Sequence, residues 1–302
     1  MLDRKRNGIA MLFLAPNIVG FAIFTLIPVI AAIVLSLFDW NLFQSPKFVG
    51  LGNFINLLGW HKEGKSWVAN DPEFWKYLGN TLFFMLAIPV NMAGSMLLAI
   101  VLNQKLRGRT IFRTIFFLPS ICAGVAIMLL WKWLYNPEFG LINYLLSLLG
   151  ITGPRWLMDY YWAKPAIMIM GTWAAVGGTN MILYLAGLQG IPPELYEAAD
   201  IDGANSWQKF RHITYPALMP TTFFIFITSV IGGFQGGFEA AYVMTGGGPA
   251  GATTTVSYYI YNHAFQWFNM GYAAAIAVVL FALVLIVTII NWKYSGKRVE
   301  YI

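Results

Sequence analysis

Five stretches of this chain are long, strongly apolar and free of Asp, Glu, Lys and Arg. They are Asn7–Phe38, Tyr77–Gln104, Pro165–Pro193, Ile213–Phe238 and Gly271–Trp292. Each is long enough to cross a bilayer, which takes about 20 apolar residues in a helix. The shorter stretch Thr114–Trp131 supplies a sixth candidate. Because lipid offers the backbone no hydrogen-bond partner, spans of this length form helices, and the sequence predicts six of them.

Composition agrees with a membrane protein and excludes an ordinary soluble domain. Apolar residues make up 58% of the chain and charged residues 11%, whereas soluble domains carry about 25% charged residues. We therefore predict an all-α membrane protein of six transmembrane helices. The predicted segments are a cytoplasmic N-terminus 1–8, spans at approximately 9–38, 77–104, 114–131, 165–189, 216–243 and 268–292, a cytoplasmic loop 190–215 and a cytoplasmic C-terminus 293–302.

A basic cluster precedes the first predicted span, and a single cysteine lies in the third. Arg4-Lys5-Arg6 resembles the start of a signal peptide, but the apolar run that follows is far longer than a signal peptide's 7–15 apolar residues. The first span is therefore expected to be retained. The single cysteine, Cys122, lies in the third predicted span, where we expect an inert, packed thiol.

The basic residues predict which side of the membrane each loop occupies. Twelve of the 19 lysines and arginines fall on the side that holds both ends of the chain: Arg4, Lys5, Arg6, Lys105, Arg107, Arg109, Arg113, Lys209, Arg211, Lys293, Lys297 and Arg298. Basic residues concentrate in cytoplasmic loops, so both termini are predicted to be cytoplasmic in a multi-pass protein of the cell membrane. This asymmetry accounts for the net charge of +6, and no nucleic-acid partner is expected.

One short motif suggests nucleotide binding, but its context argues against that function. Residues Gly59–Ser66 fit the pattern G-x-x-x-x-G-K-[ST] of a phosphate-binding loop. That function requires a strand before the loop and a helix after it, so that backbone N–H groups converge on phosphate. Here the residues lie in a loop between two spans, on the predicted outer side. We interpret the match as accidental, and we expect no catalytic residue and no bound metal in this chain.

A polar, small-residue-rich segment interrupts the apolar sequence between the fourth and fifth spans. Residues 196–216 read YEAADIDGANSWQKFRHITYP. Proline favours a first helical position, and the prolines before this segment predict a short helix over Leu195–Ile201. Asp202-Gly203 is a turn signal, and Asn205 or Ser206 can cap a second helix that runs to about Thr214. The segment is predicted to be a helix–turn–helix on the cytoplasmic membrane surface.

This segment resembles the EAA loop of ABC-importer permeases. The matching residues are Glu197, Ala198, Ala199, Asp202, Gly203, Ile213 and Pro216. Tyr215 stands where the family usually has Leu, which affects only local packing. Other stretches resemble the family's carbohydrate branch, the maltose- and glycerol-phosphate-type permeases: Trp131–Tyr135, Gly140–Asn143, Tyr242–Pro249 and Gly271–Ala275.

The resemblance implies a type I importer permease fold, a set of partners and a mechanism. This chain would pair with a second, homologous permease, most simply as a heterodimer, and the two would form the translocation pathway. Two ATPase subunits would bind ATP and Mg²⁺, while this chain binds no cofactor. A solute-binding protein outside the cytoplasm would deliver a sugar or oligosaccharide, and the EAA loop would fit a cleft in one ATPase and transmit its closure to the spans.

Polar residues inside the spans are the candidates for the solute pathway, because such groups are costly in lipid and tend to face a cavity. Four residues at helical spacing form a stripe on the fourth span: Trp173, Gly177, Asn180 and Tyr184. Four more repeat the spacing on the fifth: Thr228, Gly232, Gln235 and Glu239. Asn91 on the second span is a weaker candidate. For Asn180 and Gln235, contact with sugar and hydrogen bonding between helices are both open, and Glu239 could serve structure or an outer gate.

Three other functions compete with sugar import. The solute could be another small polar molecule, such as a glycerol-phosphate ester. An ion-coupled secondary transporter would need carboxylates within its spans, and only the fifth span carries one. A membrane-attached nucleotide enzyme would depend on Gly59–Ser66 alone.

Overall fold

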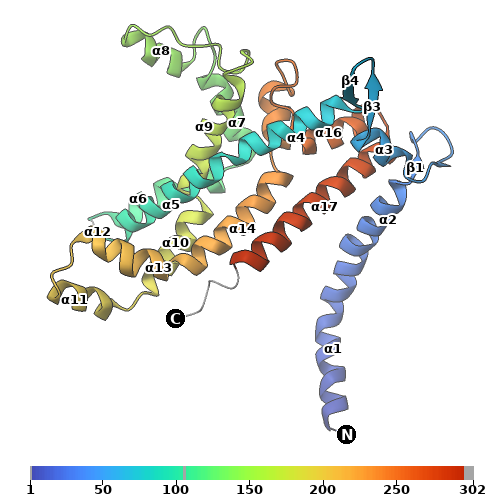
Figure 1. The fold of residues 1–302 in the computed structure, drawn as a ribbon. Coiled ribbons are helices and arrows are strands. Elements are labelled where there is room, and N and C mark those ends of the chain that lie inside the picture. Colours follow the sequence, from blue (N-terminus) through green and yellow to red (C-terminus); the bar gives the residue numbers. More distant parts are fainter. Residues whose placement is uncertain (1, 105–106, 296–302) are drawn as a thin grey trace. The chain divides into compact units, whose positions relative to one another are not determined.

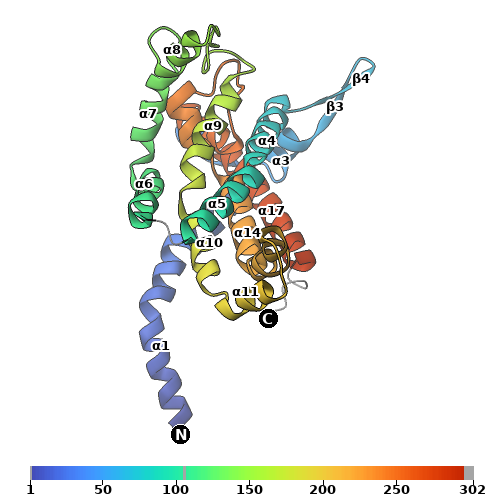
Figure 2. The same ribbon diagram turned by 90° about the vertical axis from the view of Figure 1, so that its left-hand side faces the viewer.

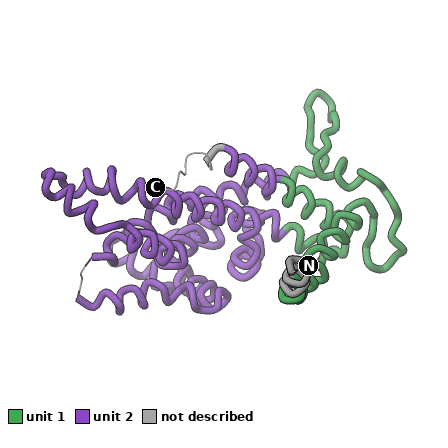
Figure 3. The backbone as a smooth tube through the Cα atoms, turned by 90° about the horizontal axis from the view of Figure 1, so that it is seen from below, with its two compact units in different colours: residues 1–74, 259–282 green, residues 75–258, 283–302 purple. Residues whose placement is uncertain are grey.

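The computed structural model describes residues 2–104 and 107–295. The chain forms two compact units, drawn in different colours in Figure 3. Unit 1 comprises Met1–Phe74 and Tyr259–Ala282, and unit 2 comprises Trp75–Tyr258 and Leu283–Ile302. Residues 1, 105–106 and 296–302 lie outside the described residues. They belong to the predicted cytoplasmic termini and loops and include the basic residues Lys105, Lys297 and Arg298.

Unit 1 begins with one long helical segment and continues into short elements. The segment consists of α1 (Leu2–Phe21), a π-helical turn (Ala22–Leu26) and α2 (Ile27–Leu35). Next come β1 (Phe38–Asp39), β2 (Lys47–Phe48), α3 (Gly52–Leu58), β3 (Trp60–Glu63) and β4 (Ser66–Ala69). The long helices α4 (Pro72–Met85) and α17 (Met270–Ser295) each begin in unit 1.

Two small β-hairpins depart from the all-α prediction. β1 pairs antiparallel with β2, and β3 with β4. The second hairpin is rich in residues that favour strands, Trp60 on β3 and Trp67 and Val68 on β4. A glycine at φ +61°, Gly64, makes the tight turn between them. Strands this short show too few alternations of apolar and polar residues to be predicted from the sequence beside the apolar spans.

Unit 2 is a helical assembly, shown in two views in Figures 1 and 2. Its further helices are α5 (Ala87–Asn103), α6 (Arg109–Ile121), α7 (Gly124–Leu134), α8 (Leu141–Leu148), α9 (Ala163–Val176), α10 (Thr179–Gln189), α11 (Pro193–Ile201), α12 (Ser206–Lys209), α13 (Tyr215–Ala217), α14 (Met219–Gln235) and α15 (Phe238–Ala240). The helix α16 (Val256–Tyr261) begins in unit 2 and ends in unit 1. π-Helical turns occupy Phe210–Thr214 and Ala241–Thr245 in unit 2, and Asn262–Gln266 in unit 1. In both views α8 and α11 lie at opposite ends of unit 2, as expected if the loops that carry them face opposite sides of a membrane.

Among the described residues, four helices are long and apolar enough to cross a membrane. They are Met11–Leu35, Pro72–Asn103, Ala163–Gln189 and Met270–Lys293. Two bent helix pairs pass the same criteria together, and counting each as one span raises the total to six. The second span starts earlier than the predicted residue 77, because Asp71 caps α4 by accepting the N–H of Phe74 at 2.9 Å.

The predicted span 114–131 is not one straight helix. α6 ends at Ile121, α7 begins at Gly124, and the two meet at 97°. Pro119 lacks a backbone donor and weakens the last turn of α6, and Cys122 adopts an extended conformation at the break. Cys122 is exposed, so the expectation of a packed thiol is wrong for this conformation of the chain.

The predicted span 216–243 also requires correction. α14 ends at Gln235, and Gly237, with φ +83°, starts the separate short helix α15. A positive φ is open to glycine at little cost, and the two consecutive glycines allow the chain to turn here. At its other end, α14 meets the helix Ser206–Ala217 at 61°.

The core of unit 2 forms where α5 packs against α9, α10 and α14. Its buried residues include Leu102 on α5, Met181 and Leu185 on α10, Leu218 immediately before α14, and Ile225 within α14. A second core joins α7 and α9 around Trp131, Tyr135 and Met170. Within lipid such helices associate through close packing and not through exclusion of water, so small side chains matter at the crossings.

Candidate functional site

The loop between α10 and α14 has the predicted helix–turn–helix form. α11 starts with Pro193 at a first helical position. Gly203 follows at φ +74° and reverses the chain. Asn205 caps α12 with a capping box: its Oδ1 accepts the N–H of Gln208 at 2.9 Å, and the Gln208 side chain accepts the N–H of Asn205 at 2.7 Å. The structure thereby selects Asn205 over Ser206 as the cap.

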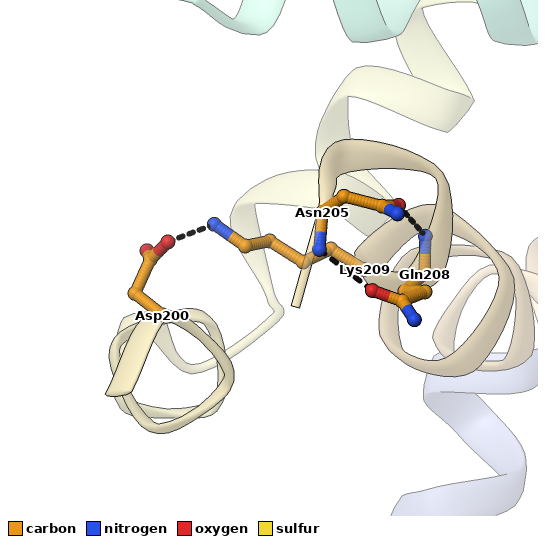
Figure 4. A network of polar contacts seen from close by, with 4 residues as sticks. All are labelled: Asp200, Asn205, Gln208 and Lys209. Carbon is orange, nitrogen blue, oxygen red and sulfur yellow. Dashed lines mark hydrogen bonds and ion pairs between the residues drawn. The ribbon is translucent and has the colours of Figure 1, made fainter. Parts of the chain in front are cut away.

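Side-chain contacts fix the two helices of this loop to each other. Lys209 on α12 forms an ion pair with Asp200 on α11 (Figure 4). Tyr196 on α11 shares a hydrogen bond of 2.9 Å with the Thr214 hydroxyl. Because Asp200 is largely exposed, the ion pair orients the helices more than it stabilises them. The two helices of the loop are therefore joined by side-chain contacts as well as by the turn at Gly203.

Most of the residues that match the EAA pattern are exposed on the surface of this loop. Glu197, Ala198, Asp202 and Gly203 are exposed, while Ala199 is partly buried. At the far end, Ile213 and Pro216 are also partly buried, and Ile213 packs against the core around α10. The loop therefore presents one exposed end and anchors the other in unit 2.

Sequence reasoning missed two exposed apolar side chains in the loop. Ile201 is 87% exposed and Trp207 is 64% exposed. Large apolar groups at such exposure in a loop of otherwise polar residues are typical of contact surfaces. Their position beside a turn signal, on either side of Gly203, was the available clue.

The predicted stripe on the fourth span is interrupted, because α9 ends before Gly177 and α10 begins after Gly178. Trp173 is about half exposed and contacts the ring of Trp131 edge-on, with centroids 5.6 Å apart. Tyr184 is 1% exposed and belongs to the core of α5, α10 and α14. Asn180 is partly buried in the first turn of α10. The four residues thus do not share one face.

Gly177 is a point of close approach between helices. It is buried, and a Cβ added there would overlap the carbonyl oxygen of Phe116 on α6. Only glycine lets these two backbones come so close. The contact gives Gly177 a packing role.

The stripe predicted on the fifth span divides at Gly236. Thr228, Gly232 and Gln235 remain on α14 and are exposed. Glu239 lies on α15, and a Cβ added at Gly124, the first residue of α7, would lie 3.2 Å from its Oε2. A carboxylate near a helix N-terminus is stabilised by the helix dipole, which favours the structural alternative for Glu239.

Asn91 lies elsewhere, on α5. It lines a cavity of about 190 Å³ within unit 2, together with residues of α4, α9 and α15. Its Oδ1 is buried and accepts no hydrogen bond from any described residue. The candidate that the sequence ranked lowest is therefore the one with an unmet bonding requirement.

In unit 1, a polar cluster not anticipated from the sequence surrounds Asp71. Tyr259 and Tyr272 donate hydrogen bonds to its Oδ2 at 2.9 and 2.6 Å. The ring of His263 packs against both tyrosines, with centroid distances of 4.5 and 4.8 Å. Burial lowers the pKa of His263 to about 4, against the opposing effect of Asp71. These residues also line a cavity of about 570 Å³.

The phosphate-loop pattern lies on the second hairpin. Trp60–Glu63 form β3, Gly64 and Lys65 form the turn, and Ser66 begins β4. The strand–loop–helix geometry that gathers backbone N–H groups around phosphate is not formed by these residues. In the described part of the chain, moreover, no group of three or more His, Cys, Asp or Glu could hold a metal ion.

Comparisons with known proteins agree with the predicted class. A family model described as "Binding-protein-dependent transport system inner membrane component" matches residues 80–300. A lactose transport system permease protein of Rhizobium radiobacter is 39% identical, over 98% of this chain and 97% of the relative. An arabinooligosaccharides transport system permease protein of Bacillus subtilis is 36% identical, over 97% of this chain and 90% of the relative.

The chain also resembles solved structures over its whole length. Among them is a bacterial alginate ABC transporter in complex with an alginate pentasaccharide-bound periplasmic protein. The TM-score is 0.84 at 25% identity, over 99% of this chain and 97% of that one.

Proposed function

The chain belongs to the family of binding-protein-dependent transport system inner membrane components, and on that premise we propose that it forms half of the pathway of an ATP-driven importer for a sugar or oligosaccharide. The full-length similarity to permeases named for lactose and arabinooligosaccharides supports the substrate class. The same similarity supports a transport subunit that leaves ATP hydrolysis to a partner.

The observation that carries the coupling part of the proposal is the geometry of the loop 193–217. Its second helix meets α14 at 61°, so a movement of the exposed end of the loop, here called the tip, is passed to the span through that helix. Ile213 and Thr214 hold the other end of the loop in unit 2, and Thr214 is buried. An exposed tip joined to an anchored base is the arrangement that transmission of an ATPase movement requires.

The tip has the chemistry of a docking surface. Ala198 is small and exposed, which permits close approach, while Ile201 and Trp207 offer apolar area. Anchors of this kind carry much of the affinity at protein interfaces. The proposed occupant is the ATPase, and Glu197 and Asp202 would lie at the polar rim.

The other proposed partners follow from the family. A second, homologous permease would complete the pathway, and two ATPase subunits would supply ATP and Mg²⁺ chemistry. A periplasmic protein accompanies the alginate transporter that this chain resembles, and we propose an extracytoplasmic binding protein here too. Both termini would face the cytoplasm.

The test is ATP-dependent uptake by the reconstituted system. The chain would be purified with the second permease, the ATPase and the binding protein encoded nearest to it, and placed in lipid vesicles. Uptake of labelled lactose and of an arabinooligosaccharide should require ATP and the binding protein. Uptake driven by an ion gradient in the absence of the ATPase would instead indicate a secondary transporter.

The competing solute class is a glycerol-phosphate ester. Labelled glycerol 3-phosphate in the same vesicles distinguishes the two, since the proposal expects the saccharides to be imported at the higher rate. Preferential uptake of the ester would keep the importer class and replace the substrate.

A further inference from the structure

A cavity of about 190 Å³ lies among α4, α5, α9 and α15, wholly within unit 2. Its wall includes the apolar side chains of Phe84, Ile167 and Met168 and the polar side chains of Asn91, Thr172 and Thr253. The volume is roughly six times the 30 Å³ that a water molecule occupies in the liquid. It is of the order of a single sugar ring.

Two of the three polar side chains have no hydrogen-bond partner among the described residues. Asn91 Oδ1 is buried and accepts no hydrogen bond. The Thr172 hydroxyl likewise forms no hydrogen bond with a described residue. The Thr253 hydroxyl, by contrast, donates to the carbonyl oxygen of Gly248 at 2.9 Å. A buried acceptor without a partner costs about 1–3 kcal/mol, and at membrane depth lipid cannot supply the missing donor.

Charge narrows the choice of what fills the cavity. The residues that line it include no Asp, Glu, Lys, Arg or His. Moving an ionised group into such surroundings without a counter-charge is strongly unfavourable. An uncharged ligand with several hydroxyl groups fits: its hydroxyls can satisfy Asn91 and Thr172, and its C–H faces can pack on Phe84 and Met168.

We infer that Asn91 and Thr172 form a subsite for one uncharged sugar ring on the transport pathway. The inference rests on the proposed function and adds to it that the substrate is uncharged and that two residues on different spans contact it. It raises Asn91, which was only a weaker candidate from the sequence, and adds Thr172, which lies outside the polar stripe of the fourth span. It also excludes phosphate esters and acidic sugars from this position.

The test uses the complete transporter in vesicles, with Asn91→Leu and Thr172→Val. Each removes hydrogen-bonding groups and keeps a similar volume. At saturating, sugar-loaded binding protein, each should lower uptake of the neutral saccharide about fivefold to tenfold, the effect of one lost hydrogen bond. ATP hydrolysis stimulated by the loaded binding protein should stay within about twofold of wild type, because the ATPase-facing loop is unchanged.

Thr288→Val is the matched control, because the Thr288 hydroxyl donates to the carbonyl oxygen of Val284 in its own helix at 2.7 Å. It should leave uptake unchanged. Assembly is checked by co-purification of the ATPase, and Asn91→Ala replaces Asn91→Leu if the latter does not assemble.

The outcomes separate the inference from the function it rests on. Wild-type uptake in all variants would mean that the cavity holds water only, which overturns the subsite and leaves the importer intact. Preferential import of glycerol 3-phosphate would overturn the uncharged class. Failure of wild type to import any of the probes with ATP would overturn the proposed function itself.

Discussion

The phenol of Tyr272 donates a hydrogen bond of 2.6 Å to Oδ2 of Asp71, a residue 201 positions earlier in the chain. Tyr259 donates to the same oxygen at 2.9 Å. The bonds join the end of the second hairpin to the start of α17 and to α16, so that the two segments of unit 1 are held by one carboxylate.

Tyr272→Phe should lower the free energy of unfolding by about 1–2 kcal/mol, since a hydrogen bond to a charged group is lost while Tyr259 still satisfies part of the carboxylate. The measurement is the thermal denaturation midpoint of the purified complex. Tyr161→Phe is the control: Tyr161 is 82% exposed and its phenol makes no hydrogen bond to a described residue. Equal midpoints for Tyr272→Phe and wild type would contradict the prediction.

Acid should destabilise the protein through His263. Its pKa in the folded state, lowered to about 4 by burial, lies below the ordinary value near 6.5. Between these values the unfolded state binds the proton and the folded state does not, so stability falls as the pH drops from about 6.5 towards 4. We expect the denaturation midpoint of wild type to decrease from pH 7 to pH 5, and His263→Phe to flatten that decrease. Parallel curves for the two proteins would assign the acid effect to other groups.

Gly177→Ala should loosen the contact between α6 and the α9–α10 junction, because the new methyl group would overlap the carbonyl oxygen of Phe116. The backbones must separate, at a cost of about 1–3 kcal/mol. Gly79→Ala is the matched control, since a Cβ there meets nothing within 4 Å. Thermal stability of the complex measures both. A Gly177→Ala variant that is stable but defective in sugar uptake would instead support the pathway role predicted from the sequence.

Gly203→Val should weaken attachment of the ATPase without disturbing the spans. Nothing lies within 4 Å of a Cβ at this position, so the cost comes from the backbone at φ +74°, roughly 1–2 kcal/mol. Gly203→Asn is the control, because asparagine tolerates this conformation. Ala198→Trp should have a similar effect through bulk at the exposed tip. The measurements are co-purification of the ATPase and solute-stimulated hydrolysis, and normal values for Gly203→Val and Ala198→Trp would remove the loop from the coupling mechanism.

Lys65→Ala should leave transport unchanged, because Lys65 lies in the turn of a hairpin and not in a phosphate-binding loop. ATP-driven uptake by the reconstituted variant is the measurement. A large loss of uptake with normal assembly would show that the hairpin acts in transport.

Local features were predictable from the sequence, and long-range contacts were not. Gly203 and Asn205 specify the loop because a turn and a cap depend on a few neighbouring residues. The apolar runs locate the helices for the same reason. The break at Cys122 was missed because hydropathy continues through it, and only Pro119 marked the weakness.

The candidate functional residues show the same difference between local features, which the sequence predicts, and long-range contacts, which it does not. The contact of Asp71 with Tyr272, and of Gly177 with Phe116, depends on how distant parts of the chain meet. Spacing along one helix therefore grouped Tyr184 with Trp173, although one is in the core and the other is exposed. Asn91 is distinguished from the other candidates by its buried Oδ1 without a hydrogen-bond partner, which the sequence does not show.

The N-terminal helix has a consequence for how the complex holds together. It is apolar over Met11–Leu35, and none of its most apolar 18-residue window is buried within unit 1. Acyl chains solvate such a surface about as well as another apolar helix does, so lipid can cover this segment without any packing against the other elements of unit 1. Stability that the segment gains by packing on a neighbouring subunit obeys mass action within the plane of the membrane. The assembled fraction should then decrease as the complex is diluted with additional lipid, in the way that a dimer dissociates on dilution in water.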